Sequence, residues 1–329
     1  MKARNAGAPF RQARALLPLL AEGSVLVGGQ AVIEGVLMRL PQTYAVAVRD
    51  PQGEVRVRRE RLPETAKGRF GNLPFVRGTV ILFKSLMLGI SALNFSAEVA
   101  MAEEGGAGSK SGEGAEEKPA STWALALTVA VSLALGVALF FYLPLLLTQF
   151  LSRYLEMAKH SVGFNLIDGL IRVVFFLAYI LGISLLKDIR RVFAYHGAEH
   201  KVVFTWEAKE PLTVENARKK STLHPRCGTS FLLFVMVVSI LVFSLVPASY
   251  PFWAKALSRI VFLPLIAGIS YELIRFTARF PRSPLVKPLI WPGLAFQLLT
   301  TREPDDTMLE VAIRALGEAR DLAQEPVVA

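Results

Sequence analysis

The stretch Trp123–Leu147 reads WALALTVAVSLALGVALFFYLPLLL and holds no charged side chain. An α-helix needs about 20 apolar residues to cross the hydrocarbon core of a bilayer, so this stretch can span it with some tilt. The whole chain of 329 residues is 53% hydrophobic, which is unusually apolar for a soluble protein of this length. The sequence therefore predicts a mostly α-helical, polytopic membrane protein.

Three further apolar stretches predict spans, which gives four transmembrane helices in all. They are Asn165–Leu186, Thr229–Val246 and Leu257–Ile274. The first of them contains Asp168 and Arg172, which lie four residues apart. Residues at this spacing share one face of a helix, so we expect the two charges to pair.

Basic residues set the orientation of these spans. Residues 187–228 hold nine lysines and arginines, whereas each short segment on the opposite side holds one or two. The positive-inside rule then places residues 187–228 and both termini in the cytoplasm. A fifth span at 79–99 would move the nine basic residues outside, so we predict a helix there that lies on the membrane or packs against the bundle. The predicted location is the cytoplasmic (inner) membrane, with the lipid bilayer as partner.

Alternating apolar and polar residues precede the helices. The stretches TYAVAVR (43–49) and EVRVRRE (54–60) have the period of two that is typical of strands, and DPQG (50–53) is a turn signal between them. Together with SVLVGGQAVIEGVLMRL (24–40) they predict a small three-stranded β-unit on the cytoplasmic face. Such a unit is marginal alone, so we expect it to pack on the cytoplasmic loop.

These patterns divide the chain into eight predicted segments. They are an N-terminal lead-in (1–24), the cytoplasmic β-unit (25–76), a membrane-surface helix (77–100), an acidic disordered linker (101–121), the first two transmembrane helices (122–187), a cytoplasmic metal-site loop (188–228), the last two transmembrane helices (229–276), and a cytoplasmic C-terminal segment with an amphipathic helix (277–329).

Net charge and cysteine content exclude two classes of protein. The formal charge of +10 fits a membrane protein with a basic cytoplasmic face better than a nucleic-acid-binding protein, so we expect no nucleic-acid partner. Cys227 is the single cysteine, which excludes an internal disulfide and therefore a disulfide-stapled exported fold.

Residues 195–201 read YHGAEHK and bring together two of the four histidines of the chain. His196 and His200 share one face of a helix, close enough to grip one metal ion. The string His-x-x-Glu-His is the reversed form of a zinc-protease signature, in which the glutamate polarises a water molecule. Glu199 is therefore the candidate catalytic residue. Gly197 lies between the histidines and weakens the prediction of a rigid helix.

A second pair of candidate ligands follows in HPRCG, where His224 and Cys227 lie three residues apart. A turn is expected here, because Pro225 disfavours helix at the residue before it. Four ligands would close the coordination shell, which is typical of a structural Zn²⁺ site. Three ligands and a water would leave Glu199 free to act as a general base, which is typical of a catalytic site.

Two other acidic residues and one glycine-rich tripeptide are further candidates for a role at the site. Glu272 near the cytoplasmic end of the fourth span could add a ligand or base, or pair with Arg275 or Arg279. Glu34 could reach the metal loop, or pair with Arg39. The tripeptide GGQ (28–30) is best explained by a backbone that is closely packed.

Five blocks of sequence carry a family resemblance: GGQAVIEGVLMR, YHGAEHKVV, HPRCGTSF, GISYELIRF and LTTREPDD. In this order they resemble the YqhQ-like family of bacterial multi-pass membrane proteins, which carry domain of unknown function 1385. The resemblance covers residues from about 25 to 320. It implies a predicted metal-dependent enzyme without an established reaction, and any metal role would fall on His196, Glu199, His200, His224 and Cys227.

The leading functional hypothesis is a metal-dependent membrane enzyme, a hydrolase by the reversed zinc motif, with its site at the cytoplasmic membrane face. The expected cofactor is a divalent transition metal, Zn²⁺ before others. The alternative is a scaffold or assembly factor that binds other membrane proteins and uses the metal to staple a cytoplasmic cap.

Overall fold

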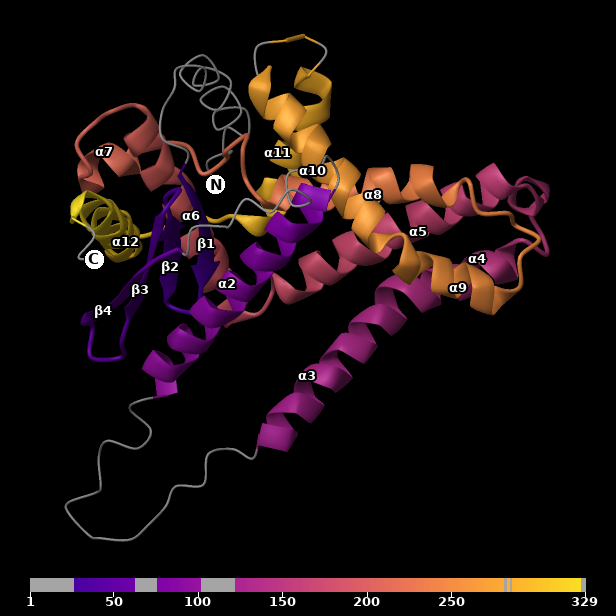
Figure 1. Cartoon of the computed structure of the whole chain (residues 1–329), viewed down its shortest axis with the longest axis horizontal. Coiled ribbons are helices and arrows are strands. Elements are labelled where there is room, and N and C mark those ends of the chain that lie inside the picture. The colour runs from indigo at the N-terminus through magenta and orange to yellow at the C-terminus, as the bar shows by residue number, and fades with distance from the viewer. Residues whose placement is uncertain (1–26, 63–75, 102–121, 281–282, 285, 327–329) are drawn as a thin grey trace, which may run out of the picture.

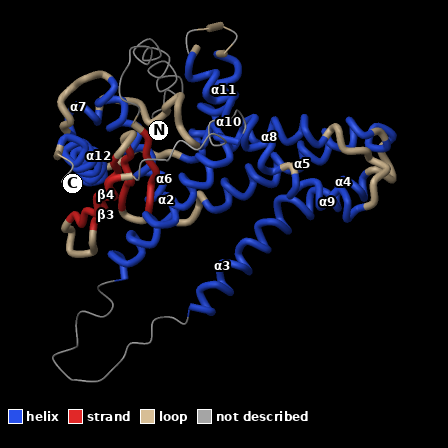
Figure 2. Tube along the Cα trace, viewed as in Figure 1, coloured by secondary structure: helices blue, strands red, loops and turns tan. Residues whose placement is uncertain are grey.

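The computed structural model describes residues 27–62, 76–101, 122–280, 283–284 and 286–326 (Figure 1). The predicted lead-in and all but the first residue of the predicted acidic linker lie outside these described residues. Strands gather at one end of the molecule, and helices make up the rest (Figure 2).

The β-unit is a four-stranded antiparallel meander, not the three-stranded unit that we expected. Its strands run in the order β1-β2-β3-β4. The error arose at Glu34, whose φ of 51° breaks the first apolar stretch into two strands joined by a tight turn. The turn predicted at DPQG is confirmed, since Gly53 takes a φ of 93° between the last two strands. The strands are β1 (Gly28–Val32), β2 (Gly35–Arg39), β3 (Thr43–Arg49) and β4 (Val55–Arg61).

Helices cover both faces of this sheet, which explains why a small β-unit is stable. Helices α6 (Lys187–Glu207) and α12 (Asp306–Gln324) bury one face, against side chains such as Val36 and Met38. Helix α2 (Val76–Met101) buries the other face, and there Ala92 packs with the strand residues. Figure 1 shows α2 on one side of the strands and α12 on the other.

Helix α2 is shared between the sheet and the helical bundle. Its C-terminal half packs on the sheet, and its N-terminal half packs on α10 (Leu263–Arg279), where Gly78 lies against Tyr271. Its outer face is apolar and exposed, and it carries Val80, Phe83, Leu86, Met87, Ile90 and Leu93. The helix is also long and apolar enough to cross a membrane.

The first predicted span forms one continuous helical rod. It comprises α3 (Thr122–Val137), the π-helical turn η2 (Ala138–Tyr142) and α4 (Leu143–Leu151). Pro144 explains the wide turn. A proline inside a helix lacks an N–H and crowds the carbonyl of the preceding turn, and a π-turn relieves both problems.

Three helices in the described residues could each cross a membrane, or four if one bent pair forms a single span. The second predicted span is α5 (Ser161–Ile183). The fourth is the bent pair of α9 (Phe252–Val261) and α10, whose axes differ by 45°. The third, α8 (Thr229–Phe243), is shorter than expected, with 15 residues. The remaining elements are η3 (Glu156–Lys159), α7 (Val214–Arg218) and α11 (Lys287–Thr300).

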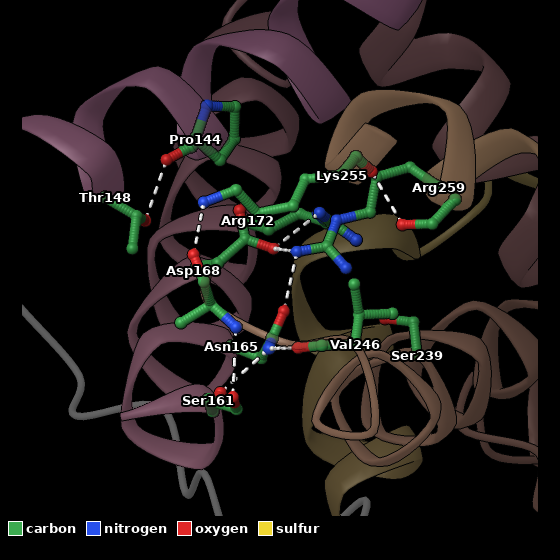
Figure 3. A network of polar contacts seen from close by, with 12 residues as sticks. Pro144, Thr148, Ser161, Asn165, Asp168, Arg172, Ser239, Val246, Lys255 and Arg259 are labelled. Carbon is green, nitrogen blue, oxygen red and sulfur yellow. Dashed lines mark hydrogen bonds and ion pairs between the residues drawn. The ribbon is translucent and has the colours of Figure 1, made fainter. Parts of the chain in front are cut away.

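A buried ionic cluster joins α5 to α9 (Figure 3), two helices that lie at the end of the bundle away from the strands in Figure 1. The predicted pair of Asp168 and Arg172 is confirmed, with 2.9 Å between Oδ2 and Nη2. The same carboxylate also accepts from Arg259, at 2.9 Å. Arg259 is 0% exposed and donates in addition to the Oδ1 atom of Asn165.

Candidate metal centre

Helix α6 carries the candidate site because its two faces differ. Tyr195, Ala198 and Val202 pack into the core beneath the sheet, which turns His196, Glu199 and His200 to the other side of the helix. The histidines are one turn apart, and their ring centroids lie 4.4 Å from each other.

Helix α6 is continuous through Gly197, although glycine is a weak helix former. A Cβ atom at this position would lie 2.0 Å from the backbone oxygen of Arg302. Glycine is therefore required because the segment after α11 crosses the helix at van der Waals distance. This crossing brings Thr300 beside His196.

Backbone carbonyls fix both histidine rings. The Nδ1 atom of His196 lies 2.8 Å from the carbonyl oxygen of Thr300, and that of His200 lies 2.5 Å from the oxygen of Thr222. A carbonyl can only accept, so each Nδ1 must carry the proton. Metal-binding histidines are usually oriented in this way, with Nε2 left to face the ion.

The two Nε2 atoms converge on Cys227. The turn that begins at His224 places the Sγ atom of Cys227 3.1 Å from Nε2 of His196. Nε2 of His200 is buried and has no hydrogen-bond partner among the described residues. The three candidate ligand atoms lie within 4.8 Å of one another. This group could hold a metal ion, and a bound cation would satisfy the orphaned nitrogen.

The electrostatics of His196 and Cys227 fit a proton shared between them. Burial raises the pKa of Cys227, but His200 and His196 outweigh it and hold that pKa well below its usual range. Burial lowers the pKa of His196, but Cys227 and Glu199 outweigh it and raise that pKa to about 9. A thiolate is the form of cysteine that binds metals.

Glu199 is buried beside the three candidate ligands but is not one of the group. Its side chain is 7% exposed, and its Oε2 atom has no hydrogen-bond partner in the described part of the chain. Burial raises its pKa, although His196 and His200 act in the opposite direction. The side chain lies directly against β1, where a Cβ atom on Gly29 would be 2.7 Å from its Cγ atom.

His224 takes a different place from the one that a four-ligand site needs. Its Nδ1 atom accepts from the backbone N–H of Arg226 at 3.2 Å, and Nε2 lies 3.3 Å from a carboxylate oxygen of Glu207. Both ring nitrogens therefore have partners. Burial lowers the pKa of His224, against the opposing effect of Glu207. The side chain of Gln297 accepts from the backbone N–H of His224 and donates to its carbonyl oxygen, at 2.8 Å each.

The two other acidic candidates form ion pairs away from the group. Glu34 binds Arg191 on α6 through both carboxylate oxygens, at 2.5 Å each, so it reaches the helix of the site but not the ligands. Glu272 binds Arg77 on α2, at 2.6 and 2.5 Å. This pair links α10 to α2.

Comparison with known proteins places the site inside a family domain. The family model DUF1385, described as a protein of unknown function, matches residues 73–322. The chain belongs to the DUF1385 family. The uncharacterized protein YqhQ from Bacillus subtilis (strain 168) is 35% identical over 300 residues, which cover 88% of this chain and 91% of the relative. No solved structure matches the chain.

In this DUF1385 member the candidate site opens into a cavity of about 670 Å³. Residues 27–31 of the β1 segment form one wall. The helical bundle also contributes to the lining, with Ile180 of α5, Leu232 of α8 and Phe296 of α11. The cavity therefore lies where the sheet meets the apolar helices.

Several residues of this DUF1385 site escaped the sequence analysis. Thr222 and Thr300 act through backbone carbonyls, which any residue type supplies, so their side chains give no signal. Gly29 did give a sequence signal. The close packing expected for GGQ is confirmed at this glycine, which lies against Glu199. Gln30 also lines the cavity, and its side chain lies against Gly89 of α2.

Proposed function

We propose that this protein is a metal-dependent hydrolase at a membrane face. His196, His200 and Cys227 hold a divalent transition metal, Zn²⁺ before others, and Glu199 is the general base. The observation that carries the proposal is the pair of buried histidines whose Nδ1 atoms are fixed by carbonyls and whose Nε2 atoms face one thiol.

The donor set fits zinc. Imidazole and thiolate are the ligands that Zn²⁺ favours, and three protein ligands leave one tetrahedral position for a water or a substrate. When bound, the metal supplies a Lewis acid that polarises the substrate and activates water. Because both nitrogens of His224 have partners, the arrangement favours three ligands over a closed set of four.

Glu199 would move the proton in the reaction. Its buried carboxylate has an oxygen without a partner beside the ligand group, so it can accept a proton from the attacking water. The water oxygen bonds to the substrate carbonyl carbon, the bond to the leaving group breaks, and Glu199 returns the proton to the leaving atom.

We further propose that the sheet and the site face the cytoplasm in the bacterial inner membrane. Because the sheet packs on α6 and α12, all three lie on one side, and each chain segment between them must cross the membrane an even number of times. The rod of α3, η2 and α4 with α5 gives two crossings, so α2 cannot cross as well. Its exposed apolar face would then lie on the bilayer surface.

The rival proposal comes from another class. The metal would hold α6 to the turn at Cys227, and the protein would be a scaffold for other membrane proteins. Glu199 separates the two hypotheses. A scaffold has no use for a buried carboxylate with an unsatisfied oxygen, and such a group costs stability.

Metal content is the first test. We expect one equivalent of zinc per chain in protein purified in detergent, and loss of that metal in His196→Ala. Glu199→Gln should keep the metal and the folding stability, because it alters neither a ligand nor the side-chain volume. Absence of metal from wild type after reconstitution with Zn²⁺ under reducing conditions would exclude both hypotheses. Destabilisation or metal loss in Glu199→Gln would instead contradict its role as a base.

A further inference from the structure

We propose that the substrate is a polypeptide that binds as an additional strand along β1, which makes the reaction the hydrolysis of a peptide bond. This inference rests on the proposed function and assigns a substrate class to the same site. The carrying observation is the outer edge of β1, which pairs with no other described strand and borders the candidate ligands inside one cavity.

The direction of the backbone groups in β1 follows from the ladder. The N–H of Arg49 donates to the carbonyl of Glu34, so even-numbered residues of β2 turn their peptide groups toward β3. Odd-numbered residues of β2 therefore turn toward β1, where they meet Gly28, Gln30 and Val32. The N–H and C=O groups of these three residues of β1 form hydrogen bonds with β2.

The alternate residues, Gly29 and Ala31, direct their peptide groups away from the sheet. Ile33 follows the same alternation, and its carbonyl accepts from the Ser96 hydroxyl of α2, at 2.5 Å. In the described parts of the chain, Gly29 and Ala31 have no such partner at this edge. They offer two donor–acceptor pairs spaced by roughly 6.8 Å, which is the repeat of an extended strand.

This edge adjoins the proposed catalytic groups. Gly29 touches the side chain of Glu199, where an added Cβ would lie 2.7 Å from the carboxyl carbon. Residues 27–31 line the same cavity as His196, His200 and Cys227. A strand added here would enter the cavity that Glu199 and the three ligands line.

The chemistry of the edge selects a peptide over a lipid ester. Paired donors and acceptors at the strand repeat complement another extended backbone, which is the basis of peptide recognition by strand addition. A lipid ester has no N–H groups to answer the two carbonyls. In the proposed reaction the C–N bond breaks, Glu199 carries the proton of water to the leaving nitrogen, and a carboxylate and an amine result.

The apolar lining of the cavity indicates which side chains would fit. Ile180, Leu232 and Phe296 are apolar and belong to helices of the bundle. They would receive apolar side chains from the added strand. The best substrate would be an extended, apolar segment close to the membrane surface.

Hydroxamates that bind metals can test the edge without knowledge of the natural sequence. We would replace the metal by Co²⁺ and follow its absorption while titrating three probes into full-length protein in detergent. The probes are acetohydroxamate, octanohydroxamate and the hydroxamate of N-acetyl-Ala-Leu-Ala. The first binds through the metal alone, the second adds an acyl chain, and the third adds a peptide backbone.

We expect the peptide probe to bind at least about tenfold more tightly than acetohydroxamate, since each added hydrogen bond contributes up to about one order of magnitude. Ala31→Pro removes an N–H that faces the cavity and leaves the ladder bonds to β2 intact. It should abolish most of this gain without changing the affinity for acetohydroxamate. Ala31→Ser is the matched control, because it retains the N–H and should retain the gain.

A second measurement does not depend on how the proline variant folds. Alternate amides of the probe should face β1, so N-methylation at one position should remove the gain and N-methylation at the next should leave it.

The inference is overturned if the peptide adds no affinity, if both methylated probes bind alike, or if octanohydroxamate gains more than the peptide. In each case acetohydroxamate would still report the metal site. Failure to bind Co²⁺, or a cobalt spectrum that no hydroxamate perturbs, would instead sink the proposed function.

Discussion

At the residue scale, a few backbone atoms position the histidines of the candidate site. Two backbone carbonyls orient two imidazoles, and one missing Cβ lets another backbone cross the helix that carries them. None of these three features depends on a reactive side chain. The reactive groups were visible in the sequence as His-x-x-Glu-His, whereas the atoms that hold them were not.

Gly197→Ala tests the close crossing at residue scale. Alanine is the better helix former, so propensity alone predicts a gain of about 0.5–1 kcal/mol. The new Cβ would meet the backbone oxygen of Arg302 at 2.0 Å, and we expect a net loss of about 1–3 kcal/mol instead. Unfolding by urea in detergent micelles would measure the difference.

The matched control is Gly317→Ala. This glycine also lies inside a helix, α12, and a Cβ there would meet nothing within 4 Å. It should stabilise the protein by about 0.5–1 kcal/mol. Equal effects of the two substitutions would show that the crossing at Gly197 is not tight.

At the scale of elements, α5 and α9 are joined by charges rather than by apolar packing alone. Asp168 serves two arginines, and Lys255 of α9 is also buried close by and lies over the ring of Phe164. The described cluster thus holds three cations and one carboxylate. Removing the only anion would leave the cations without a counter-charge in an apolar bundle.

We expect Asp168→Asn to destabilise the protein by about 3–5 kcal/mol, the usual cost of breaking a buried ion pair from one side. Thermal unfolding in detergent would report the loss. Glu156→Gln is a fitting control, because it breaks an exposed pair with Lys159 near the same end of the bundle and should change little. A mild effect of Asp168→Asn would mean that water or lipid headgroups reach the cluster.

At the scale of the whole molecule, sequence patterns predicted the long apolar helices well and the assembly poorly. The apolar run at 123–147 and the i, i+4 pair at Asp168 and Arg172 are local, so both were readable. The ion pair of Arg259 with Asp168 joins segments about 90 residues apart. The contact of the His196 ring with the carbonyl of Thr300 joins segments about 100 residues apart. Periodicity does not encode contacts at such separations. The four-stranded sheet was missed because one left-handed residue, Glu34, divides a continuous apolar stretch.

The proposed topology makes a prediction at this scale. A C-terminal green fluorescent protein fusion should fluoresce, and alkaline phosphatase fused at residue 157 should be active, because only the latter point lies outside the cytoplasm. Alkaline phosphatase fused at residue 110 should be inactive if α2 stays on the inner surface. Activity at residue 110 together with a fluorescent C-terminus would contradict the even-crossing argument.

The contact between Thr43 and Ala319 has a consequence for synthesis. The hydroxyl of Thr43 donates to the carbonyl of Ala319 across 276 residues, and α12 seals the same face of the sheet. The strands leave the ribosome well before the helix that covers them. Until α12 is made, the part of this apolar face that α12 covers in the finished fold stays open to chaperones, proteases and the bilayer surface. A product that stops before residue 306 lacks α12 and leaves that part of the face exposed.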